Sequence, residues 1–384
     1  MITQIKKLAK KVPFAKRVYR TFIKERNSSN SSNQIENYQK VSGVTVLTDP
    51  LTTTAGHTIP IRIFLQAANA ITTAQGISTP RIVFTNKKPG PQSISGDVLI
   101  INGISPLLSG AIRSAISKAV YRGTLDSTRV YIYLHEEGFV FDRIVNEGRG
   151  AAIEFISEFT VIPLTQRLKH YYECSRGWKC TEPVYNAAIH YPRSACPLPG
   201  SDKHINILTI ASLQTRKGVD RIVQLAEEAE RRGLSNVHFH WIGPHGKGVT
   251  GPLPESFPRN FTWWGAISAE HLQHVIPSVS CIILPSYSDP LPLSIWEAVM
   301  LGKQCFVSSE VGSSEIGLSD LIKVLDFSNG AAGNLDAILS ACSMEPSVVT
   351  ADIEKLMHFT HPSAFYARMA KQINFPSLLP LQRG

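Results

Sequence analysis

Two carboxylates in the second half of the chain stand at a spacing that suits a hydroxyl-bearing ligand. Asp289 and Glu297 are eight positions apart in the stretch SYSDPLPLSIWEAV, and Pro290 and Pro292 between them favour the start of a helix. One carboxylate could accept hydrogen bonds from a sugar hydroxyl and the other from a ribose diol. The same spacing also fits a helix cap followed by a solvated side chain, so both interpretations stay open at this point.

The expected helix start and a nearby lysine both favour an anion. A helix leaves the amides of its first turn without partners, and a phosphate is the simplest group to occupy them. Lys217 stands at a second place of this kind, because an apolar strand precedes it and a helical pattern begins at Val219. A lysine beside such amides adds a point charge that also favours a phosphate. The amides expected to face the ligand at the first helix start are those of Leu291, Leu293 and Ser294.

One histidine in the first half is a candidate for acid–base chemistry or for binding a sugar. His135 directly follows the apolar stretch RVYIYL, and Glu136 after it could orient the imidazole. A histidine at the end of a strand is also often purely structural. Gly56 stands in an expected loop between strand and helix, where it permits close approach of a ligand or simply forms a turn.

The elements that must position these residues alternate between strand and helix. In the first half, strands VTVLT, RIVFT, DVLII and RVYIYL are separated by helical stretches such as IPIRIFLQAANAI, and in the second half NILTIASL, VHFHWIG, FTWWG and CIILPS repeat the pattern. This alternation predicts an α/β fold with parallel sheets, helices on both faces, and ligands at the carboxyl ends of the strands. A proline-rich stretch over residues 191–199 reads as a linker between the halves.

Length and composition agree with two globular domains. The chain has 384 residues, of which 43% are hydrophobic and 18% charged, which excludes a disordered or disulfide-dense protein. Six cysteines without a CxxC pair indicate neither a zinc site nor a disulfide framework. The net charge of +9 is concentrated at the start, because residues 1–26 hold nine basic side chains and one acidic, a net +8, and the other 358 residues carry +1. A nucleic-acid partner is therefore not expected.

The basic segment over residues 1–26 has apolar residues at helical spacing, which predicts an amphipathic helix in two pieces that meet near Val12, before Pro13. Such a segment suits an anionic membrane surface; a helix docked on the protein body and a nucleic-acid-binding arm are the alternatives. Residues 27–40 form an expected polar linker. Without a signal peptide or an apolar run of transmembrane length, the body is expected in the cytoplasm, peripheral on the inner face of the cell membrane.

Several motifs of the second half, in order and spacing, resemble the C-terminal domain of family-4 retaining glycosyltransferases of the GT-B fold. They are ASLQTRKGVDRIV, WIG, WWGAIS and LPSYSDPLPLSIWEAVMLGKQCFVSSEVGSSEI, and they cover residues 206–317. In the first half, LHE at residues 134–136 and VYNAAI at residues 184–189 look like the histidine-bearing strand end and the pre-hinge strand of that family.

The resemblance implies two Rossmann-like doubly wound domains that face a central cleft. Residues 41–200 would bind the acceptor and residues 201–360 the nucleotide-sugar donor, while residues 361–384 would form a helix that crosses back to the first domain. Lys217 would then bind the donor diphosphate, Asp289 the donor sugar and Glu297 the ribose. His135 would approach the sugar from the other domain, Gly56 would lie near the phosphates, and the backbone after Gly265 near the base.

Two departures from the family pattern concern this donor site. The family usually has Glu where Asp289 stands, and it often has Arg where Ser212 stands, so one phosphate cation is missing. Arg216 is the residue that could compensate. Both departures bear on the identity of the donor.

The activity that the resemblance implies is transfer of a sugar from a nucleotide-diphosphate sugar, with retention, to an acceptor. We expect a lipid-linked saccharide of cell-envelope polysaccharide synthesis as that acceptor. Because the chain has no D-x-D pair, Lys217 and the helix amides are expected to stabilise the leaving group without a metal or cofactor. The alternatives are a nucleotide-sugar isomerase of the same fold and a non-catalytic, membrane-tethered binding protein.

Overall fold

The computed structural model describes residues 43–49, 59–75, 80–85, 94, 96–187, 204–246, 253–316, 321–343 and 360–374. The predictions for residues 1–26, for the linker at 27–40 and for Gly56 lie outside the described residues. The chain divides into two compact units. Unit 1 contains the described residues up to Leu164, Leu168–Val184 and those from Tyr366 onward; unit 2 contains Thr165–Arg167 and Tyr185–Phe365.

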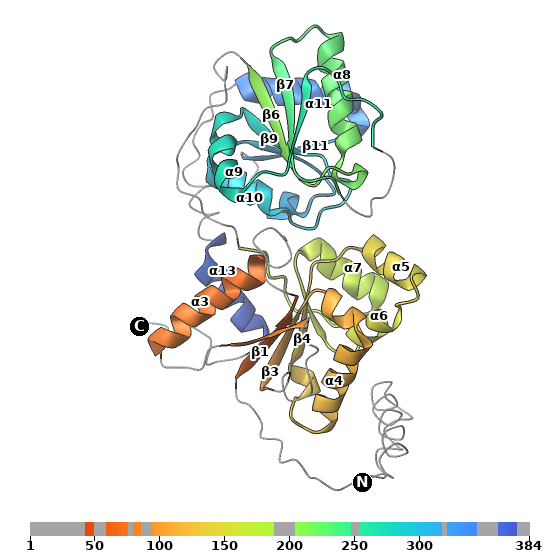
Figure 1. Ribbon diagram of the computed structural model, residues 1–384, viewed down its shortest axis with the longest axis vertical. Helices are drawn as coiled ribbons and strands as arrows, with labels where there is room; N and C mark the ends of the chain where they lie inside the picture. The colour runs from red at the N-terminus through yellow and green to blue at the C-terminus, as the bar shows by residue number, and fades with distance from the viewer. Residues whose placement is uncertain are drawn as a thin grey trace. The chain divides into compact units, whose positions relative to one another are not determined.

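Unit 1 is built on a five-stranded parallel sheet with the strand order β2-β1-β3-β4-β5. Helices α3 and α13 lie on one side of the sheet, and α4, α6 and α7 lie on the other (Figure 1). The strands are β1 (Val44–Thr48), β2 (Arg81–Phe84), β3 (Val98–Asn102), β4 (Val130–Leu134) and β5 (Thr160–Pro163). The helices are α3 (Ile59–Gln75), α4 (Gly110–Tyr121), α5 (Gly138–Asn146), α6 (Ala151–Ile156), α7 (Gln166–Arg176) and α13 (Pro362–Gln372).

The middle strands of unit 1 are buried along their whole length because both faces of the sheet are covered. Every residue of β3 and β4 is buried, as the uninterrupted apolar stretches VLII and VYIYL predict for central parallel strands. Tyr366 of α13 stacks on Phe64 of α3, with ring centroids 5.5 Å apart, so a segment from the end of the chain completes this unit. His135 is the first residue after β4.

Unit 2 contains a six-stranded parallel sheet with the strand order β11-β10-β9-β6-β7-β8. Its strands are β6 (Ile205–Ile210), β7 (Val237–Ile242), β8 (Phe261–Gly265), β9 (Cys281–Leu284), β10 (Cys305–Ser308) and β11 (Ile322–Leu325). Its helices are α8 (Val219–Arg231), α9 (Ala269–Val275), α10 (Leu293–Met300) and α11 (Gly330–Ser343). The apolar face of α8, including Val219, Ile222 and Leu225, packs in one core with Phe239 and Trp241 of β7.

The strand order of each sheet reverses at one point, and ligands of open α/β sheets bind at the carboxyl ends of the strands there. In unit 2 the reversal lies between β6 and β9, so the loops after these two strands flank it. In unit 1 it lies between β1 and β3. These observations confirm the predicted α/β fold with two doubly wound sheets.

One predicted strand is wrong. Residues 184–187 form no strand, and residues 188 and 189 of the same motif lie outside the described residues. The segment runs beside the end of β5, where Val184 N donates to Pro163 O at 2.9 Å, but Pro183 directly before it has no N–H to continue a ladder. Helices α5 and α7 were not anticipated from the sequence.

No helix among the described residues combines the length and the apolarity that crossing a bilayer requires.

Candidate functional site

Lys217 and Asp289 meet at the switch point of unit 2, although 72 positions separate them in the sequence. Lys217 ends the 3-10 turn Thr215–Lys217 in the loop after β6, and Asp289 lies in the loop after β9. The ammonium group donates to the Asp289 carboxylate, and the two side chains are only 13% and 9% exposed. The two residues that the sequence singled out for a diphosphate and a sugar therefore share one shielded place.

Close backbone approach holds the two loops together. Gly218 follows Lys217 with a φ of 77°, and a Cβ atom there would lie 2.2 Å from Pro285 O, so only glycine fits. Tyr287 N donates to Arg216 O at 2.9 Å, and the Arg216 guanidinium donates back to Ser288 O. Arg216, expected as a compensating phosphate cation, thus uses its guanidinium to bind the loop after β9 that carries Asp289, which we call the acidic loop.

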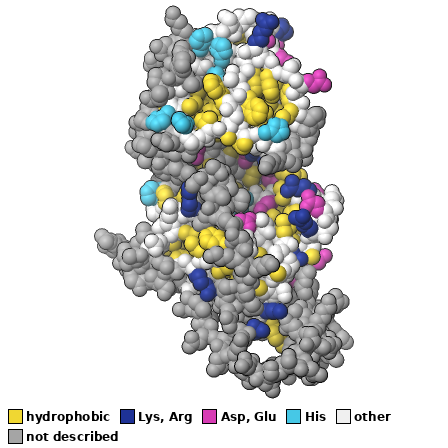
Figure 2. All heavy atoms as spheres, viewed as in Figure 1, with side chains coloured by type: hydrophobic (Ala, Val, Ile, Leu, Met, Phe, Trp, Pro, Cys, Tyr) yellow, Lys and Arg dark blue, Asp and Glu magenta, His cyan; other side chains and the backbone are white. Residues whose placement is uncertain are grey.

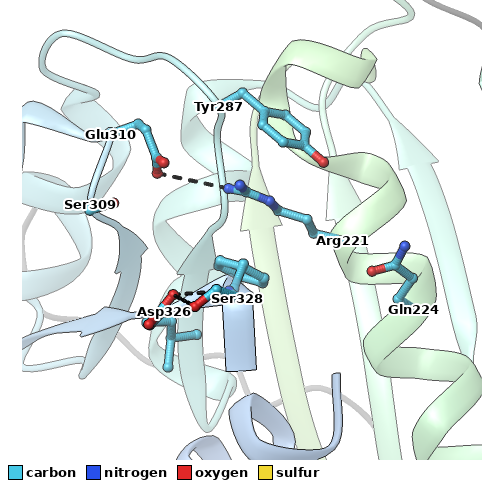
Figure 3. A pocket seen from close by; sticks show the side chains of 9 residues that line it. Arg221, Gln224, Tyr287, Ser309, Glu310, Asp326 and Ser328 are labelled. Carbon is cyan, nitrogen blue, oxygen red and sulfur yellow. Dashed lines mark hydrogen bonds and ion pairs between the residues drawn. The ribbon is translucent and has the colours of Figure 1, made fainter. Parts of the chain in front are cut away.

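Arg221, in the first turn of α8, points toward Tyr287 and Glu310 (Figure 3). Its Nη1 atom donates to Pro285 O at 3.0 Å and lies 3.9 Å from the carboxylate of Glu310. Its guanidinium carbon is 3.8 Å from the ring centroid of Tyr287 and 4.5 Å from that of Phe327. A guanidinium between two aromatic rings is favourable and fixes the planes of all three groups.

The side chains around Arg221 border a cavity of about 350 Å³ that opens at the carboxyl ends of β9, β10 and β11. The Tyr287 hydroxyl donates to Asp220 at 2.5 Å. None of Lys217, Asp289 and Glu297 lines this cavity, so it is a neighbour of the switch-point pair and not the same site.

The loop after β10 packs directly on the acidic loop. Gly312 N donates to Asp289 O at 2.9 Å, and a Cβ atom on Gly312 would lie 1.7 Å from Pro290 O. Only glycine can stand there, because any side chain would push the acidic loop away. Sequence reasoning did not select Gly312; its position four residues after a buried strand, inside VGSSE, was the available signal.

Glu297 is the most unusual carboxylate of unit 2. It is the fifth residue of α10 and is 7% exposed, and no described residue donates a hydrogen bond to it. Burial raises the pKa of Glu297 to about 7. A buried carboxylate without donors is costly to keep, so it is a candidate for meeting the hydroxyls of a ligand.

The start of α10 lies beside this carboxylate. Pro292 caps the helix with a φ of −69° and without a side-chain hydrogen bond, so the amides of Leu293 and Ser294 have no side-chain cap. Leu291, directly before the cap, is buried. The Ser294 hydroxyl donates to Ile210 O at the end of β6, at 3.2 Å, which ties this helix start to the strand that precedes Lys217.

The remaining donor-site candidates of unit 2 have local roles. The hydroxyl of Ser212 accepts a hydrogen bond from the Gln214 side chain. Gly265 ends β8 with a φ of 70°, and its carbonyl accepts from Gly243 N at 2.8 Å. A Cβ atom on Gly265 would meet open space, so glycine is favoured there by the left-handed backbone conformation and not by close packing.

His135 belongs to unit 1, where Asn102 and not Glu136 contacts the imidazole. His135 Nε2 lies 2.9 Å from Asn102 Oδ1. The Glu136 carboxylate instead accepts from the backbone N–H groups of His135 and Ile104, at 3.0 and 2.9 Å. Glu136 therefore binds backbone N–H groups and does not orient the ring as the sequence predicted. Asn102, which contacts the ring, is a residue that sequence reasoning missed.

No group of three or more His, Cys, Asp and Glu side chains in the described part of the chain is arranged to hold a metal ion.

These two doubly wound units and the switch-point loops define the GT-B fold, as comparison with solved structures shows. The HepE protein of Anabaena, in complex with UDP-glucose, has a TM-score of 0.62 at 11% identity over 86% of this chain and 99% of that one. The glycosyltransferase WaaG, involved in lipopolysaccharide biosynthesis, has a TM-score of 0.53 at 12% identity over 88% and 100%. A trehalose-6-phosphate structure from E. coli, bound with UDP-2-fluoro glucose, has a TM-score of 0.61 at 8% identity over 87% and 99%.

Sequence comparison concerns unit 2. Residues 204–334 match the family model described as Glycosyl transferases group 1. Over 105 residues the chain is 30% identical to the alpha-galactosylglucosyldiacylglycerol synthase of Streptococcus pneumoniae (strain ATCC BAA-255 / R6). That alignment spans 26% of this chain and 27% of the relative, about a quarter of each protein.

Proposed function

We propose that the protein is a glycosyltransferase that moves a sugar from a nucleotide-diphosphate sugar to an acceptor. The observation that carries the proposal is the shielded Lys217–Asp289 pair at the switch point of unit 2, beside the start of α10. The family match over residues 204–334 supports it, and so does the likeness in fold to proteins solved with UDP-glucose and UDP-2-fluoro glucose.

Lys217 is proposed to meet the diphosphate of the donor. In the ligand-free protein its charge is balanced by Asp289, so an arriving phosphate must take over the lysine while Asp289 turns to a hydroxyl of the sugar. As the glycosidic bond breaks, negative charge grows on the leaving diphosphate. A fixed ammonium group and the amides of Leu293 and Ser294, in a place shielded from water, stabilise that charge. Transfer with retention and without a metal ion belongs to the same proposal.

Glu297 is proposed to hold the ribose. Two neighbouring hydroxyls can both donate to one carboxylate, and these bonds would supply donors to Glu297, which receives none from the residues that the structure describes. The carboxylate must be ionised to accept both, so binding of the ribose lowers the raised pKa of Glu297. In this proposal Gly56 lies near the phosphates and the backbone after Gly265 near the base, while His135 approaches the sugar from unit 1.

The acceptor is proposed to be lipid-linked or membrane-bound. The net charge of +8 on residues 1–26 suits an anionic membrane surface, and the relative from Streptococcus pneumoniae is described as a glycolipid synthase. We therefore place the protein at the inner face of the cell membrane, acting on a lipid-linked saccharide of envelope polysaccharide synthesis.

The test is a donor screen followed by product analysis. The protein is titrated with UDP-, GDP- and dTDP-sugars by calorimetry, and each bound donor is then incubated with lipid-linked saccharides and with EDTA in excess. A product heavier than the acceptor by one sugar, formed at full rate in EDTA, is the expected result. A new sugar nucleotide formed from the donor alone would identify an isomerase, and donor binding without any product would identify a binding protein.

A further inference from the structure

Three polar side chains lie in a row at the switch point of unit 1. Thr48 ends β1, Asn102 ends β3 and His135 follows β4, and these strands are neighbours in the sheet. Thr48 and Asn102 are 0% and 1% exposed. We call these three residues the polar row. An amide side chain buried between apolar strands destabilises the folded state unless its hydrogen bonds are made. The partners of Asn102 therefore indicate its role.

Asn102 presents its amide oxygen to the imidazole. Asn102 Oδ1 lies 2.9 Å from His135 Nε2, while Asn102 Nδ2 donates to Thr48 Oγ1 at 3.2 Å. An amide oxygen can only accept. The Nε2 atom of His135 must therefore carry a proton.

The rest of the surroundings fixes the ring and its backbone. The imidazole packs against the buried Tyr133 with ring centroids 4.5 Å apart at an angle of 72°. The Tyr133 hydroxyl donates to Val184 O at 2.7 Å, so that this ring is itself fixed. The Glu136 carboxylate holds the amide of His135 from the other side.

Unit 2 contains a second pair of the same kind. His240 Nε2 lies 3.0 Å from Asn206 Oδ1, and the indole Nε1 of Trp264 donates to His240 Nδ1 at 3.2 Å. An indole N–H can only donate, so His240 is neutral with its proton on Nε2. Burial and the neighbouring His238 lower the pKa of His240 to about 4, in agreement with that state. Histidine side chains, beside hydrophobic ones, reach the surface on the visible face of unit 2 (Figure 2).

We propose that Asn102 is a positioning residue that keeps a proton on Nε2 of His135, so that the neutral imidazole is the Nε2–H tautomer. In that neutral ring, any hydrogen bond through Nδ1 is one in which the imidazole accepts. A sugar hydroxyl matches that atom, whereas a phosphate or carbonyl oxygen does not. The choice of a hydroxyl as the ligand group rests on the proposed function; the tautomer does not.

The tautomer can be read directly by NMR. In protein labelled with ¹⁵N in histidine, long-range ¹⁵N–¹H correlations distinguish a protonated ring nitrogen from an unprotonated one. We expect His135 to show a proton on Nε2, with His240 as the reference for this tautomer in the same spectrum. Asn102→Leu should lose the single Nε2–H form of His135 while His240 keeps it, and the matched control Asn206→Leu should do the reverse. A dominant Nδ1–H form of His135 in the unaltered protein would overturn the proposal, and so would an unchanged tautomer in Asn102→Leu.

An isosteric variant covers the case in which Asn102→Leu does not fold. Asn102→Asp places a carboxylate against Nε2, so the Nε2–H form should persist and the pKa of His135 should rise by about 1 unit or more above that of the unaltered protein. Asn102→Asp leaves the other titratable groups near the polar row unchanged, so a shift in the pKa of His135 comes from residue 102. These groups are Tyr133, Glu136, Asp49 and Arg368. A pKa of His135 that is unchanged in Asn102→Asp would contradict the proposal.

The rate of transfer separates this proposal from the proposed function. Loss of the Nε2–H form together with a slower transfer supports both. Loss of that form with an unchanged rate supports the positioning role of Asn102 and counts against the approach of His135 to the sugar.

Discussion

Glu136 in unit 1 and Glu297 in unit 2 are both enclosed carboxylates near the switch point of a parallel sheet, but their surroundings differ. Burial raises the pKa of each. Glu136 accepts hydrogen bonds from the amides of Ile104 and His135, and these bonds offset part of the cost of burial. No described residue donates to Glu297, and its pKa reaches about 7.

The same contrast extends to the two switch points. In unit 1 the members of the polar row bond to one another, and the row contains no carboxylate, lysine or arginine. In unit 2 a lysine and a carboxylate share one shielded place next to a helix start without a side-chain cap. Similar sheets therefore hold two kinds of site: that of unit 2 contains an ion pair, and that of unit 1 orients one imidazole ring. The following predictions test this contrast, from the largest expected effect to the smallest.

Lys217→Ala should have the largest effect. If Lys217 meets the charge that grows on the diphosphate, its loss should slow transfer by about 10²- to 10³-fold, the scale of a lost oxyanion donor. Single-turnover rates at saturating donor measure this. The matched control is Lys303→Ala, because Lys303 is also part-buried in unit 2 but donates to Val279 O away from the switch point. Equal rates in the two variants would remove Lys217 from the mechanism.

Glu297→Gln should stabilise the protein and weaken donor binding. The unfolded chain releases the proton of Glu297 near pH 4.5 and the folded protein releases it near pH 7, so the folded state loses stability as pH rises through this window. The raised pKa lowers the free energy of unfolding by nothing below pH 4.5 and by about 3 kcal/mol above pH 7, and glutamine removes this loss. Urea unfolding of both proteins at pH 5 and pH 8 measures the difference.

Glu136→Gln is the counterpart in unit 1. Because Glu136 already receives two backbone N–H groups, one on each carboxylate oxygen, and an amide can accept only one of them, Glu136→Gln should stabilise the protein at pH 8 less than Glu297→Gln does. If Glu136→Gln stabilises the protein at pH 8 as much as Glu297→Gln, the contrast between the two carboxylates is wrong. For the unaltered protein, affinity for a nucleotide sugar should rise with pH through about 7, as Glu297 ionises.

Gly312→Ala should separate the loop after β10 from the acidic loop. The added methyl group would stand 1.7 Å from Pro290 O, and overpacking of this kind costs about 1–3 kcal/mol. Because Pro290 directly follows Asp289, the KM for the donor should rise as well. Gly333→Ala in α11 is the control: its methyl group would meet only Asn329 Cβ, at 3.6 Å, so stability and KM should hold or improve. An unchanged KM in Gly312→Ala would show that the acidic loop does not depend on this contact.

Tyr287→Phe should have the smallest effect. It removes one hydrogen bond, from the tyrosine hydroxyl to Asp220, and leaves the ring that stacks on Arg221. We expect a loss of about 1 kcal/mol in stability and a change of only a few-fold in donor affinity. Arg221→Ala removes the stacked guanidinium and its bond to Pro285 O, and should cost more on both measures. A larger effect from Tyr287→Phe than from Arg221→Ala would show that the tyrosine hydroxyl, and not the guanidinium, stabilises this loop.

Much of the fold could be predicted because its signals are local. Alternating apolar strands and helical stretches indicate two parallel sheets, and a lysine before a helix or prolines at a helix start show within a few residues where an anion is favoured. The strand expected over residues 184–189 failed for a local reason too, since Pro183 interrupts the hydrogen bonds that an apolar pattern alone cannot reveal.

By itself, the sequence determined the types of the functional groups and the elements that carry them: Lys217 before a helix, Asp289 and Glu297 around a helix start, and His135 after a strand. Only the tertiary structure decided their partners. Lys217 pairs with Asp289 across 72 positions, Asn102 and not the adjacent Glu136 meets the His135 ring, and Glu297 receives no hydrogen bond from the described part of the chain. The physical reason is that hydrogen bonds and burial depend on which strands lie side by side, and a parallel sheet joins strands that are distant in the chain.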